Sequence, residues 1–558
     1  MRSRAIQLWL IKRIRKYIPA ILLMVLFNVC RGLLEVAFAL GTRQVIDTAV
    51  GGTWERFYPA CVRQGGIILG LIVCLMMFRL LKERINAGLD REWKRQILHC
   101  LLNGEYAGVS AYHSGELINR MTNDVRAVND GLLNSLPALV TMVIKLIAVI
   151  SVLIRMEPAF AAMILCVGVV VIILTGLLRR KLKTINKQVS EADGKVSGML
   201  QEIMEKLLMV QAMDAGAEME IRADRMMEKR FGLQMKRKNI SLFANTSVSV
   251  MSYGSAFVAL LYGATNLLNG TMTFGGLTAL TQLVSQLQSP FVNLSGIYPK
   301  YVAMLASAER LRELYDLQEQ KQISELDVNA CYASMTHIEA KGLSFTYDRT
   351  PVFSGADFCL PKGAFAVVTG SSGIGKSTLL KLLLGIYLPE SGGLYLCGKD
   401  TEIRLDRSTR RLFSYVPQGN LLLSGTIREN LLLGRPEATE EEIKEALYVS
   451  AMDEYLNELP LGLETPLKEN AGGLSEGQAQ RLALARGILS GAPILLLDEV
   501  TSALDEETEL KVLDRIKKMK DRTCIAVTHR PAAVQLCDRH IRIEDKKIAS
   551  DTTEAKYC

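Results

Sequence analysis

A glycine-rich segment in the C-terminal half of the chain has the residue types of a phosphate-binding loop. It consists of Gly370, Ser371, Ser372, Gly373, Ile374 and Gly375, followed by Lys376, Ser377 and Thr378. The β-branched run 365–369 precedes it and the helix-favouring run 379–384 follows it, which is the strand–loop–helix setting of a P-loop. The glycines let backbone N–H groups close around phosphates, and the amino end of the helix favours negative charge. Lys376 would reach the β- and γ-phosphates of a nucleotide, and the Ser377 hydroxyl could ligate Mg²⁺.

Two carboxylates at the end of an apolar run form a second candidate part of this site. Residues 494–497 are continuously apolar, as in a buried parallel strand, and Asp498 and Glu499 follow them directly. Since α/β sheets bind ligands at the carboxyl ends of their strands, these acids should lie near the loop. Asp498 would bind Mg²⁺ through water, and Glu499 would be the base or the orienting group for the attacking water. A strand capped by solvated acids is the alternative, and the P-loop argues against it.

Further motifs follow in an order that resembles the ATP-binding-cassette (ABC) family. The segment Leu474-Ser475-Glu476-Gly477-Gln478 is similar to the signature loop of that family. In chain order the resemblance includes Tyr347, the P-loop, Gln418, the signature loop, Asp498 with Glu499, the segment 502–505 and His529. Taken singly, His529 could be an ordinary core histidine and Tyr347 a packing aromatic, so the identification depends on the ordered set.

The resemblance implies a pair of cassettes facing head to tail, with each ATP between one P-loop and the signature loop of the partner. It implies that Tyr347 stacks on adenine, that His529 holds the γ-phosphate, and that Gln418 links Mg²⁺ and water to the membrane domain. The implied catalytic residues are Glu499, His529, Gln418 and Lys376, and the implied metal ligands are Ser377, Gln418 and Asp498. The implied nucleotide-binding residues are Tyr347, Gly370 to Thr378, Ser475, Gly477, Gln478 and Asp505, the last acting across the dimer.

Two positions depart from the family pattern. Glu476 stands where the family usually has glycine, and Val500 stands where it often has alanine or proline. Neither change removes a catalytic atom, so we expect an intact site. A homodimer is the simplest inference, although an intact half paired with a different half-transporter is also possible.

The apolar runs that precede these motifs indicate a membrane domain. Of the 558 residues, 49% are hydrophobic although only 6% are aromatic. A soluble protein with so few aromatic residues rarely needs such a large hydrophobic fraction. Because a spanning helix takes about 20 apolar residues, we expect six spans, near Tyr17–Leu40, Ile67–Leu81, Leu132–Ile154, Phe160–Leu178, Thr246–Leu268 and Leu277–Ala303. The last span carries Gln282, Gln286 and Gln288, so we expect it to face partner helices or a polar cavity.

The distribution of basic residues predicts the orientation of these spans. Lysines and arginines gather after the second and fourth spans, at Lys82, Arg84, Arg91, Lys94 and Arg95, and at Arg179, Arg180, Lys181, Lys183 and Lys187. By the positive-inside rule these two long connections are cytoplasmic, and with six spans both termini lie inside. We expect the helices to continue past the membrane there, with disordered loops as the alternative. The net charge of +8 is interpreted as membrane topology rather than nucleic-acid binding.

The predicted fold is an α-helical six-helix transmembrane bundle followed by an α/β P-loop NTPase cassette. The expected boundaries are 1–315 for the bundle, 316–334 for a charged linker and 335–558 for the cassette. In the bundle, residues 114–124 and 215–218 resemble the inner connections of the exporter module and are expected near the helices that couple it to the cassettes. The eleven cysteines show no CxxC spacing, and we expect small buried side chains rather than disulfides or metal ligands.

Charged residues also fall inside the predicted spans, among them Glu35 and Lys145. Glu35 in the first span and Lys145 in the third cost roughly 2.5 to 3.5 kcal/mol each in lipid. We expect them to pair or to contact the cargo, while snorkelling of Lys145 with an interfacial Glu35 is the alternative.

The resemblance implies an ATP-driven exporter in the lipid bilayer, in a bacterial plasma membrane, with ATP and Mg²⁺ as cofactors. Small-molecule, lipid and peptide cargoes all stay open. An exporter-like importer of a small chelate is an alternative on the same architecture, whereas a non-transport ABC ATPase would lack the spans.

Overall fold

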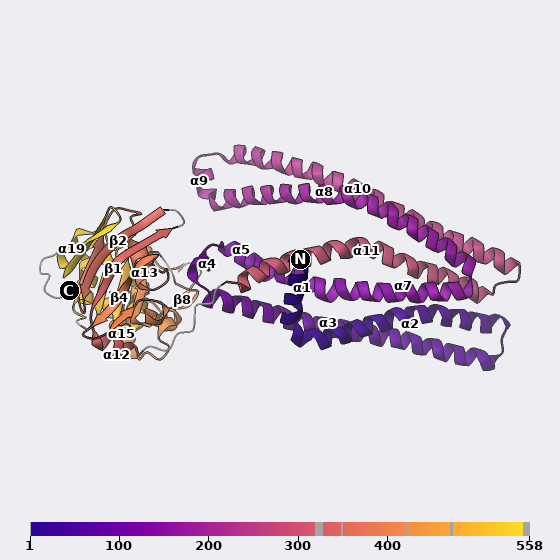
Figure 1. Cartoon of the computed structure of the whole chain (residues 1–558), viewed down its shortest axis with the longest axis horizontal. Helices are drawn as coiled ribbons and strands as arrows, with labels where there is room; N and C mark the ends of the chain where they lie inside the picture. Colours follow the sequence, from indigo (N-terminus) through magenta and orange to yellow (C-terminus); the bar gives the residue numbers. More distant parts are fainter. Residues whose placement is uncertain are drawn as a thin grey trace. The chain divides into compact units, whose positions relative to one another are not determined.

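The computed structural model describes residues 2–317, 327–347, 350–419, 422–468, 472–519 and 521–550 (Figure 1). Side chains within these ranges are described except at 2–3, 165–183, 244–245, 248, 288–296, 298, 532 and 549–550. The chain divides into two compact units. The first comprises Met1–Leu102 and His113–Asp316, and the second comprises Asn103–Tyr112 and Leu317–Cys558.

Long helices make up the first unit. They are α1 (Arg2–Arg13), α2 (Ile18–Gly51), α3 (Trp54–Asn103), α7 (Leu136–Met156), α8 (Pro158–Glu205), α10 (Gly216–Leu268) and α11 (Phe274–Tyr315). Shorter elements join them: η1 (Arg15–Tyr17), α5 (Ser114–Asn119), η2 (Arg120–Asp124), α6 (Val125–Asp130), η3 (Gly131–Ser135) and α9 (Leu207–Ala212). Four of the six predicted spans lie wholly within one of these long helices. The first span begins in η1 and continues in α2, and the third begins in η3 and continues in α7. Among the described residues, Arg15–Gly51, Trp54–Asn103 and Ser114–Met156 are long and apolar enough to cross a membrane.

Several of these helices are far longer than a bilayer requires. Helix α3 has 50 residues, α8 has 48 and α10 has 53. At 1.5 Å per residue α3 is about 75 Å long, whereas the hydrocarbon core is about 30 Å thick. The helices are therefore long enough to continue beyond the membrane, which is what the sequence predicts for both long connections.

The bundle is held by apolar packing inside and by polar contacts at one end. Helices α2, α7, α8, α10 and α11 share one buried cluster that includes Val36, Leu153 and Leu283. Near the end of α2, the Asp47 carboxylate accepts hydrogen bonds from the Thr273 hydroxyl and the Gly275 N–H, both at 3.0 Å, which joins α2 to the start of α11. In Figure 1, α8 and α10 run side by side, meet α7 and α11 at this end, and diverge from them toward α9.

The second unit is a cassette built on two main sheets. The antiparallel sheet has the order β2 (Thr350–Pro361), β1 (Met335–Tyr347), β4 (Ser391–Gly398), β5 (Glu402–Arg404). The second sheet has the order β12 (Lys547–Ser550), β11 (Arg539–Glu544), β3 (Phe365–Thr369), β10 (Thr523–Val527), β9 (Ile494–Asp498), β6 (Phe413–Val416). Its five strands from β11 to β6 are parallel. Strands β9 and β10 are buried at every residue because helices cover both faces of the sheet.

Helices and short turns complete the cassette. The helices are α12 (Val328–Ser334), α13 (Lys376–Leu383), α14 (Ile427–Leu431), α15 (Glu440–Val449), α16 (Asp453–Glu458), α17 (Glu476–Leu489), α18 (Glu506–Lys517) and α19 (Pro531–Leu536). The turns are η4 (Arg407–Leu412), η5 (Leu432–Gly434) and η6 (Gly462–Glu464), beside a small ribbon of β7 (Gly425–Thr426) and β8 (Pro466–Leu467). Helix α12 lies in the stretch expected to be linker, where the Asp327 carboxylate caps its amino end. Most of the remaining linker lies outside the described residues.

One segment from the helical half belongs to the cassette unit. It contains α4 (Tyr106–Ser110), whose Tyr106 ring meets Tyr387 edge-on at 6.0 Å. The guanidinium of Arg407 donates to the Asn103 side-chain oxygen at 3.4 Å. The sequence placed residues 114–124 near the coupling region, and the segment that groups with the cassette lies directly before them.

The cysteines follow the expectation in most cases. Eight are free thiols, at positions 30, 61, 74, 100, 331, 397, 524 and 537. Cys359 on β2 is disulfide-bonded, which corrects the expectation for that residue.

Candidate functional site

The predicted catalytic residues stand at the carboxyl ends of adjacent parallel strands. The P-loop follows β3, His529 follows β10, Asp498 ends β9, and Gln418 follows β6. These strands are consecutive neighbours in the sheet, so parallel pairing brings their ends to one edge. Four motifs that are far apart in the sequence thus meet because of the strand order.

The P-loop has the backbone form that its glycines allow. Gly373 and Gly375 have φ angles of +79° and +114°, which side chains other than glycine rarely adopt. The Lys376 ammonium donates hydrogen bonds to the carbonyl oxygens of Gly370 and Ser371 at 3.0 and 3.1 Å. Burial lowers the pKa of this lysine, and the nearby Glu499 and Asp498 carboxylates oppose that shift. Lys376 therefore spans the inside of the loop, where phosphate oxygens could take the place of the two carbonyls.

The first turn of α13 and the end of β9 bring together oxygen atoms that could bind a cation. The Ser377 hydroxyl donates to Asp498 Oδ1 at 3.0 Å, and the Tyr415 hydroxyl donates to Oδ2 at 3.1 Å. Asp498 is 2% exposed, and burial raises the pKa of its carboxyl. A buried carboxylate beside a hydroxyl offers the hard oxygen donors that Mg²⁺ prefers, so these residues fit that ion.

Glu499 adopts a strained backbone conformation in the middle of the site. Its φ is +52°, although it is not glycine, and its N–H donates to the Val527 carbonyl of β10 at 3.0 Å. The turn directs its carboxylate toward two neighbours. Gln418 donates from Nε2 to Oε2 at 2.6 Å, and His529 Nε2 lies 3.5 Å from Oε1. Strain of this kind collects at functional positions, and here it brings three of the predicted catalytic side chains together.

The signature loop caps the amino end of α17. The Ser475 hydroxyl accepts from the Gln478 N–H at 3.2 Å, while the Gln478 side chain accepts from the Ser475 N–H at 2.8 Å. A Cβ on Gly477 would approach the Ala503 carbonyl to 3.0 Å, so a small residue is needed there. Asp505 caps α18 by accepting from the Thr508 N–H at 3.0 Å, and this bond lowers the pKa of its carboxyl. The signature and Asp505 segments therefore pack together, and among the described residues neither segment makes a hydrogen bond to the P-loop.

The two departures from the family pattern fit their surroundings. Glu476 is the first residue of α17, where a carboxylate is favoured by the helix dipole. Val500 is buried in the cassette core and lies in the apolar cluster with Leu497 and Val512.

Sequence reasoning missed a buried network behind these loops. The fully buried Glu509 accepts from the Thr501 hydroxyl at 2.7 Å and from Arg530 at 3.1 Å. Arg530 also donates to the Ser502 carbonyl at 2.8 Å, and Gln480 of α17 donates to the Ser502 hydroxyl at 3.2 Å. The network ties the residue after His529 to the segment 502–505 and to the signature helix. A glutamate in the first turn of a helix is usually exposed to solvent. No local sequence signal therefore distinguishes the buried Glu509 from the exposed acids beside it.

Tyr347 belongs to an aromatic cluster beside the P-loop. Its ring meets Tyr387 at 5.3 Å and Phe345 at 4.9 Å, both edge-on. Its hydroxyl accepts from the Thr378 hydroxyl at 3.5 Å. The structure therefore brings Tyr347 to the first turn of α13.

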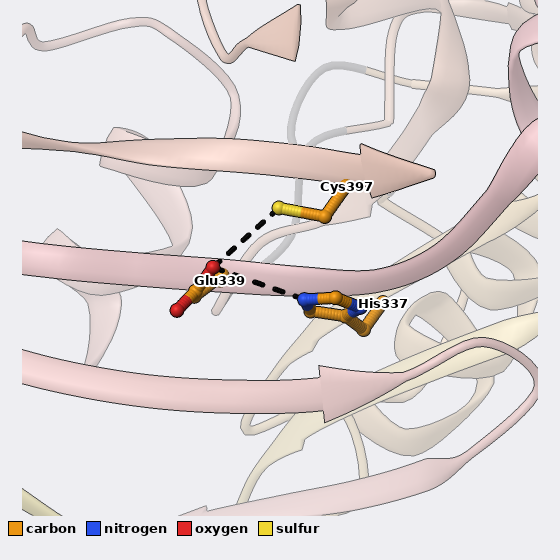
Figure 2. A group of neighbouring side chains, drawn as sticks. All are labelled: His337, Glu339 and Cys397. Carbon is orange, nitrogen blue, oxygen red and sulfur yellow. Dashed lines mark hydrogen bonds and ion pairs between the residues drawn. The ribbon is translucent and has the colours of Figure 1, made fainter. Parts of the chain in front are cut away.

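Three potential metal ligands outside this site gather on the antiparallel sheet (Figure 2). Glu339 Oε2 lies 3.8 Å from His337 Nε2 and 3.6 Å from Cys397 Sγ. The same oxygen is 3.3 Å from the Lys341 ammonium, and burial raises the pKa of the Cys397 thiol. A metal would have to compete with that ammonium and to deprotonate the thiol. We therefore interpret the group as an ion-paired cross-strand cluster.

The fold and the site define a P-loop ATPase joined to a membrane-spanning helical bundle. The family model described as the ABC transporter transmembrane region matches residues 21–291, and the one described as ABC transporter matches residues 353–502. The two together cover most of the chain. The chain belongs to the ABC transporter family and is a half-transporter of the exporter type, which hydrolyses ATP to drive transport across a membrane.

Bacterial transporters match most of this length. The chain is 27% identical over 449 residues to the fatty acid ABC transporter ATP-binding/permease protein of Mycobacterium bovis, covering 79% of this chain and 70% of that one. It is 26% identical over 551 residues to the ATP-dependent lipid A-core flippase of Bordetella pertussis, covering 97% and 88%. A bacterial Atm1-family ABC exporter with ATP bound has the same fold, with a TM-score of 0.78 and 22% identity, covering 96% of this chain and 94% of that one.

Proposed function

We propose that Glu499 activates the water that attacks ATP, with Gln418 and His529 as its positioning partners. The geometry that supports this role is the strained turn that directs one carboxylate between the Gln418 amide at 2.6 Å and the His529 ring at 3.5 Å. His529 follows β10, which pairs with the strand β3 that leads into the P-loop, so it would contact a γ-phosphate held there. A general base positioned in this way contributes about a hundredfold to ten-thousandfold in rate.

Ser377, Asp498 and Gln418 would hold Mg²⁺, and Lys376 would bind the β- and γ-phosphates. A bound Mg²⁺ neutralises charge that develops on the phosphates. The chain's own contribution is to orient the hydroxyl of Ser377, because the buried Asp498 accepts a hydrogen bond from it at 3.0 Å. Lys376 would exchange its two loop carbonyls for phosphate oxygens. Tyr347 would contribute an aromatic face for adenine at the edge of its cluster.

Two copies of the chain would form the working transporter. The proposal that Ser475, Gly477, Gln478 and Asp505 act on the nucleotide of the partner is supported by their separate position, packed against each other rather than bonded to the P-loop. A second support comes from α9, at the tip of the α8–α10 pair. Its Leu208 is 82% exposed and the adjacent Met213 is 70% exposed. The segment with α4 belongs to the same compact unit as the cassette, whereas α9 belongs to the helical unit. The cassette of a partner chain would cover the exposed apolar side chains at this tip.

The cargo would be an amphiphile that leaves the cytoplasmic side of a bacterial plasma membrane. The relatives named for a fatty acid and for lipid A-core support an amphiphile, and the basic connections support cytoplasmic termini and a cytoplasmic ATPase. On this reading residues 1–315 form the bundle, 316–334 the linker and 335–558 the cassette. Uptake of a small chelate would use the same architecture, and accumulation of cargo by cells would reveal it.

The test is ATP hydrolysis by the purified full-length protein in lipid, comparing wild type with Glu499→Gln. We expect Mg²⁺-dependent turnover to fall at least about a hundredfold while ATP binding persists, because the substitution removes only the base. Glu507→Gln is the matched control, since this exposed carboxylate lies outside the site. Turnover by Glu499→Gln at the wild-type rate would refute the assignment. No turnover from well-folded wild type would point to a different half as partner.

A further inference from the structure

A polar cluster crosses the apolar interior of the helical bundle. It consists of Arg31 and Glu35 on α2, Lys145 on α7, and Gln282 and Gln286 on α11, and we call it the intramembrane charge cluster. The Lys145 ammonium is paired with Glu35, as the sequence expected, and Arg31 lies 3.8 Å from the same carboxylate. Gln286 donates to the Glu35 backbone carbonyl at 2.8 Å. The cluster thus joins three helices of one unit.

The cluster lies deep within the spans. Along α7, Lys145 is about 16 Å from the helix end at Met156, and along α11, Gln286 is about 18 Å from the end at Phe274. The hydrocarbon core is about 30 Å thick, so both depths fall near its middle. Gly32 lets α7 approach closely, since a Cβ there would meet the Thr141 methyl at 3.1 Å. Lys145 is only 12% exposed, so it does not reach an interface.

The charges in the cluster do not balance. Arg31 and Lys145 supply two cations, and Glu35 supplies one anion. From Phe274 to Pro299, α11 carries no charged residue that could offset the difference. An excess cation in hydrocarbon is costly, and such residues persist mainly where they have a functional role.

Several buried polar atoms of the cluster also have no hydrogen-bond partner among the described residues. They are the side-chain oxygens of Gln282 and Gln286 and the Arg31 Nε donor, which is ion-paired with Glu35 at 3.8 Å but not hydrogen-bonded to it. An unpaired buried polar atom costs about 1–3 kcal/mol. A ligand with negative oxygens would pair with the two cations, and a hydroxyl beside its anionic group, as in a lysophosphatidic acid, could also donate to a glutamine oxygen. Half-buried apolar side chains lie one helical turn from the charged members on the same helices, including Phe27, Phe38 and Met142.

We propose that the intramembrane charge cluster binds the oxyanion of an amphiphilic cargo, while its tail lies on the neighbouring apolar side chains. The oxyanion is a carboxylate or a phosphate, which share the chemistry that Arg31 and Lys145 recognise. Glu35 holds Lys145 in place and limits the affinity, so the cargo can leave again. This inference rests on the proposed transport of an amphiphile and names the group that is recognised.

The excess positive charge predicts that substitutions at neighbouring residues change the affinity for an anionic amphiphile in opposite directions. Arg31→Gln and Lys145→Gln each remove the excess cation and weaken the binding of an anionic amphiphile. Glu35→Gln doubles the excess and strengthens binding. The double variant Glu35→Gln with Lys145→Gln restores the single excess charge and returns binding toward wild type. Arg43→Gln is the matched control, because Arg43 lies on the same helix but pairs with Asp47 at 3.5 Å.

The experiment measures binding to the full-length protein in neutral phosphatidylcholine nanodiscs without nucleotide. The probes are radiolabelled oleate and oleoyl lysophosphatidic acid, and monooleoylglycerol is the neutral competitor with the same tail. We expect Arg31→Gln and Lys145→Gln to lose about tenfold in affinity, a change that equals ~1.4 kcal/mol. Glu35→Gln should gain affinity, and Arg43→Gln should match wild type. The tighter of the two anions identifies the carboxylate or the phosphate as the source.

Three results would overturn the proposal. Equal loss in all three single variants would mean a purely structural ion pair. Equal competition by the neutral lipid would mean that only the tail is recognised, and no binding of either anion would exclude the site. Basal Mg²⁺-dependent ATP hydrolysis, measured on each variant, reports the proposed function separately, because the cluster contains no residue of the ATPase site. A variant that keeps this activity is folded, so its binding result counts.

Discussion

Replacing Arg530 by methionine should destabilise the cassette by leaving a buried carboxylate without its cation. Glu509 is 0% exposed and contacts Arg530 at 3.1 Å, and the Thr501 hydroxyl is its other partner. Removing one member of a buried pair costs about 3–5 kcal/mol. The Arg530 side chain is 33% exposed, so water can reach the vacated position and we expect a smaller cost, about 2–3 kcal/mol.

The assay is thermal unfolding of the full-length protein, followed on the cassette transition. For a domain of 150–250 residues, 1 kcal/mol shifts the midpoint by about 2–4 °C, so the expected drop is about 4–12 °C. The second variant, Arg530→Met with Glu509→Gln, should recover most of it, because a neutral amide can still bond Thr501. Lys511→Met is the control, since its pair with Glu454 is exposed and contributes at most about 1 kcal/mol.

The reasoning fails if the double variant is as unstable as the single one, because the cost would then come from lost packing and not from an unpaired charge. A functional readout accompanies the stability measurement. Arg530 also donates to the Ser502 carbonyl at 2.8 Å, so its loss should loosen the segment 502–505. ATP turnover of the double variant should therefore stay reduced even after its stability has recovered.

Three further perturbations test separate parts of the site. Gly375→Ala should weaken ATP-analogue binding and cost about 1–3 kcal/mol, because φ is +114° and the new Cβ would lie 2.3 Å from a Val352 methyl; unchanged binding would contradict this. Because burial raises the pKa of Asp498, the folded cassette takes up a proton there more readily than the unfolded chain, so its contribution to stability falls as pH rises through that pKa. Mg²⁺ affinity should instead fall as the pH is lowered, because protonated Asp498 cannot bind the ion. The fall should begin at a higher pH than for an aspartate with an ordinary pKa, and Mg²⁺ titrations at several pH values check this. Tyr106→Ala removes an aromatic contact with Tyr387 worth about 0.5–1.5 kcal/mol and should reduce cargo-stimulated but not basal ATP hydrolysis.

Features with a local physical cause were predictable from the sequence. The strand at 365–369 coincides with β3, and the run at 494–497 is β9 without its last residue. All six spans fall in helices, because a chain in lipid must satisfy its own backbone hydrogen bonds. The pairing of Glu35 with Lys145 was predictable for the same reason, since hydrocarbon offers a charge few other partners.

Features that depend on tertiary contacts were not predictable. The network of Glu509, Arg530 and Gln480 brings together three segments that no spacing relates. The bounds of the segment that joins the cassette unit, 103–112, were not predictable either, because its contact depends on the Tyr106 ring meeting Tyr387. The strained turn at Glu499 follows from the pairing of β9 and β10, which a single strand does not reveal.

The groups proposed to act on ATP are already bonded to one another within a single chain. Lys376 bonds two loop carbonyls, Glu499 is held by Gln418 and faces His529, and Ser475 caps its own helix. Each of these bonds satisfies a polar group that would otherwise be costly to bury or to leave unpaired. Nucleotide and partner must therefore replace existing bonds rather than fill empty positions. Breaking these bonds costs free energy, which is recovered only when ATP and the partner chain together supply the replacement contacts. Hydrolysis should therefore depend steeply on both the ATP concentration and dimer formation.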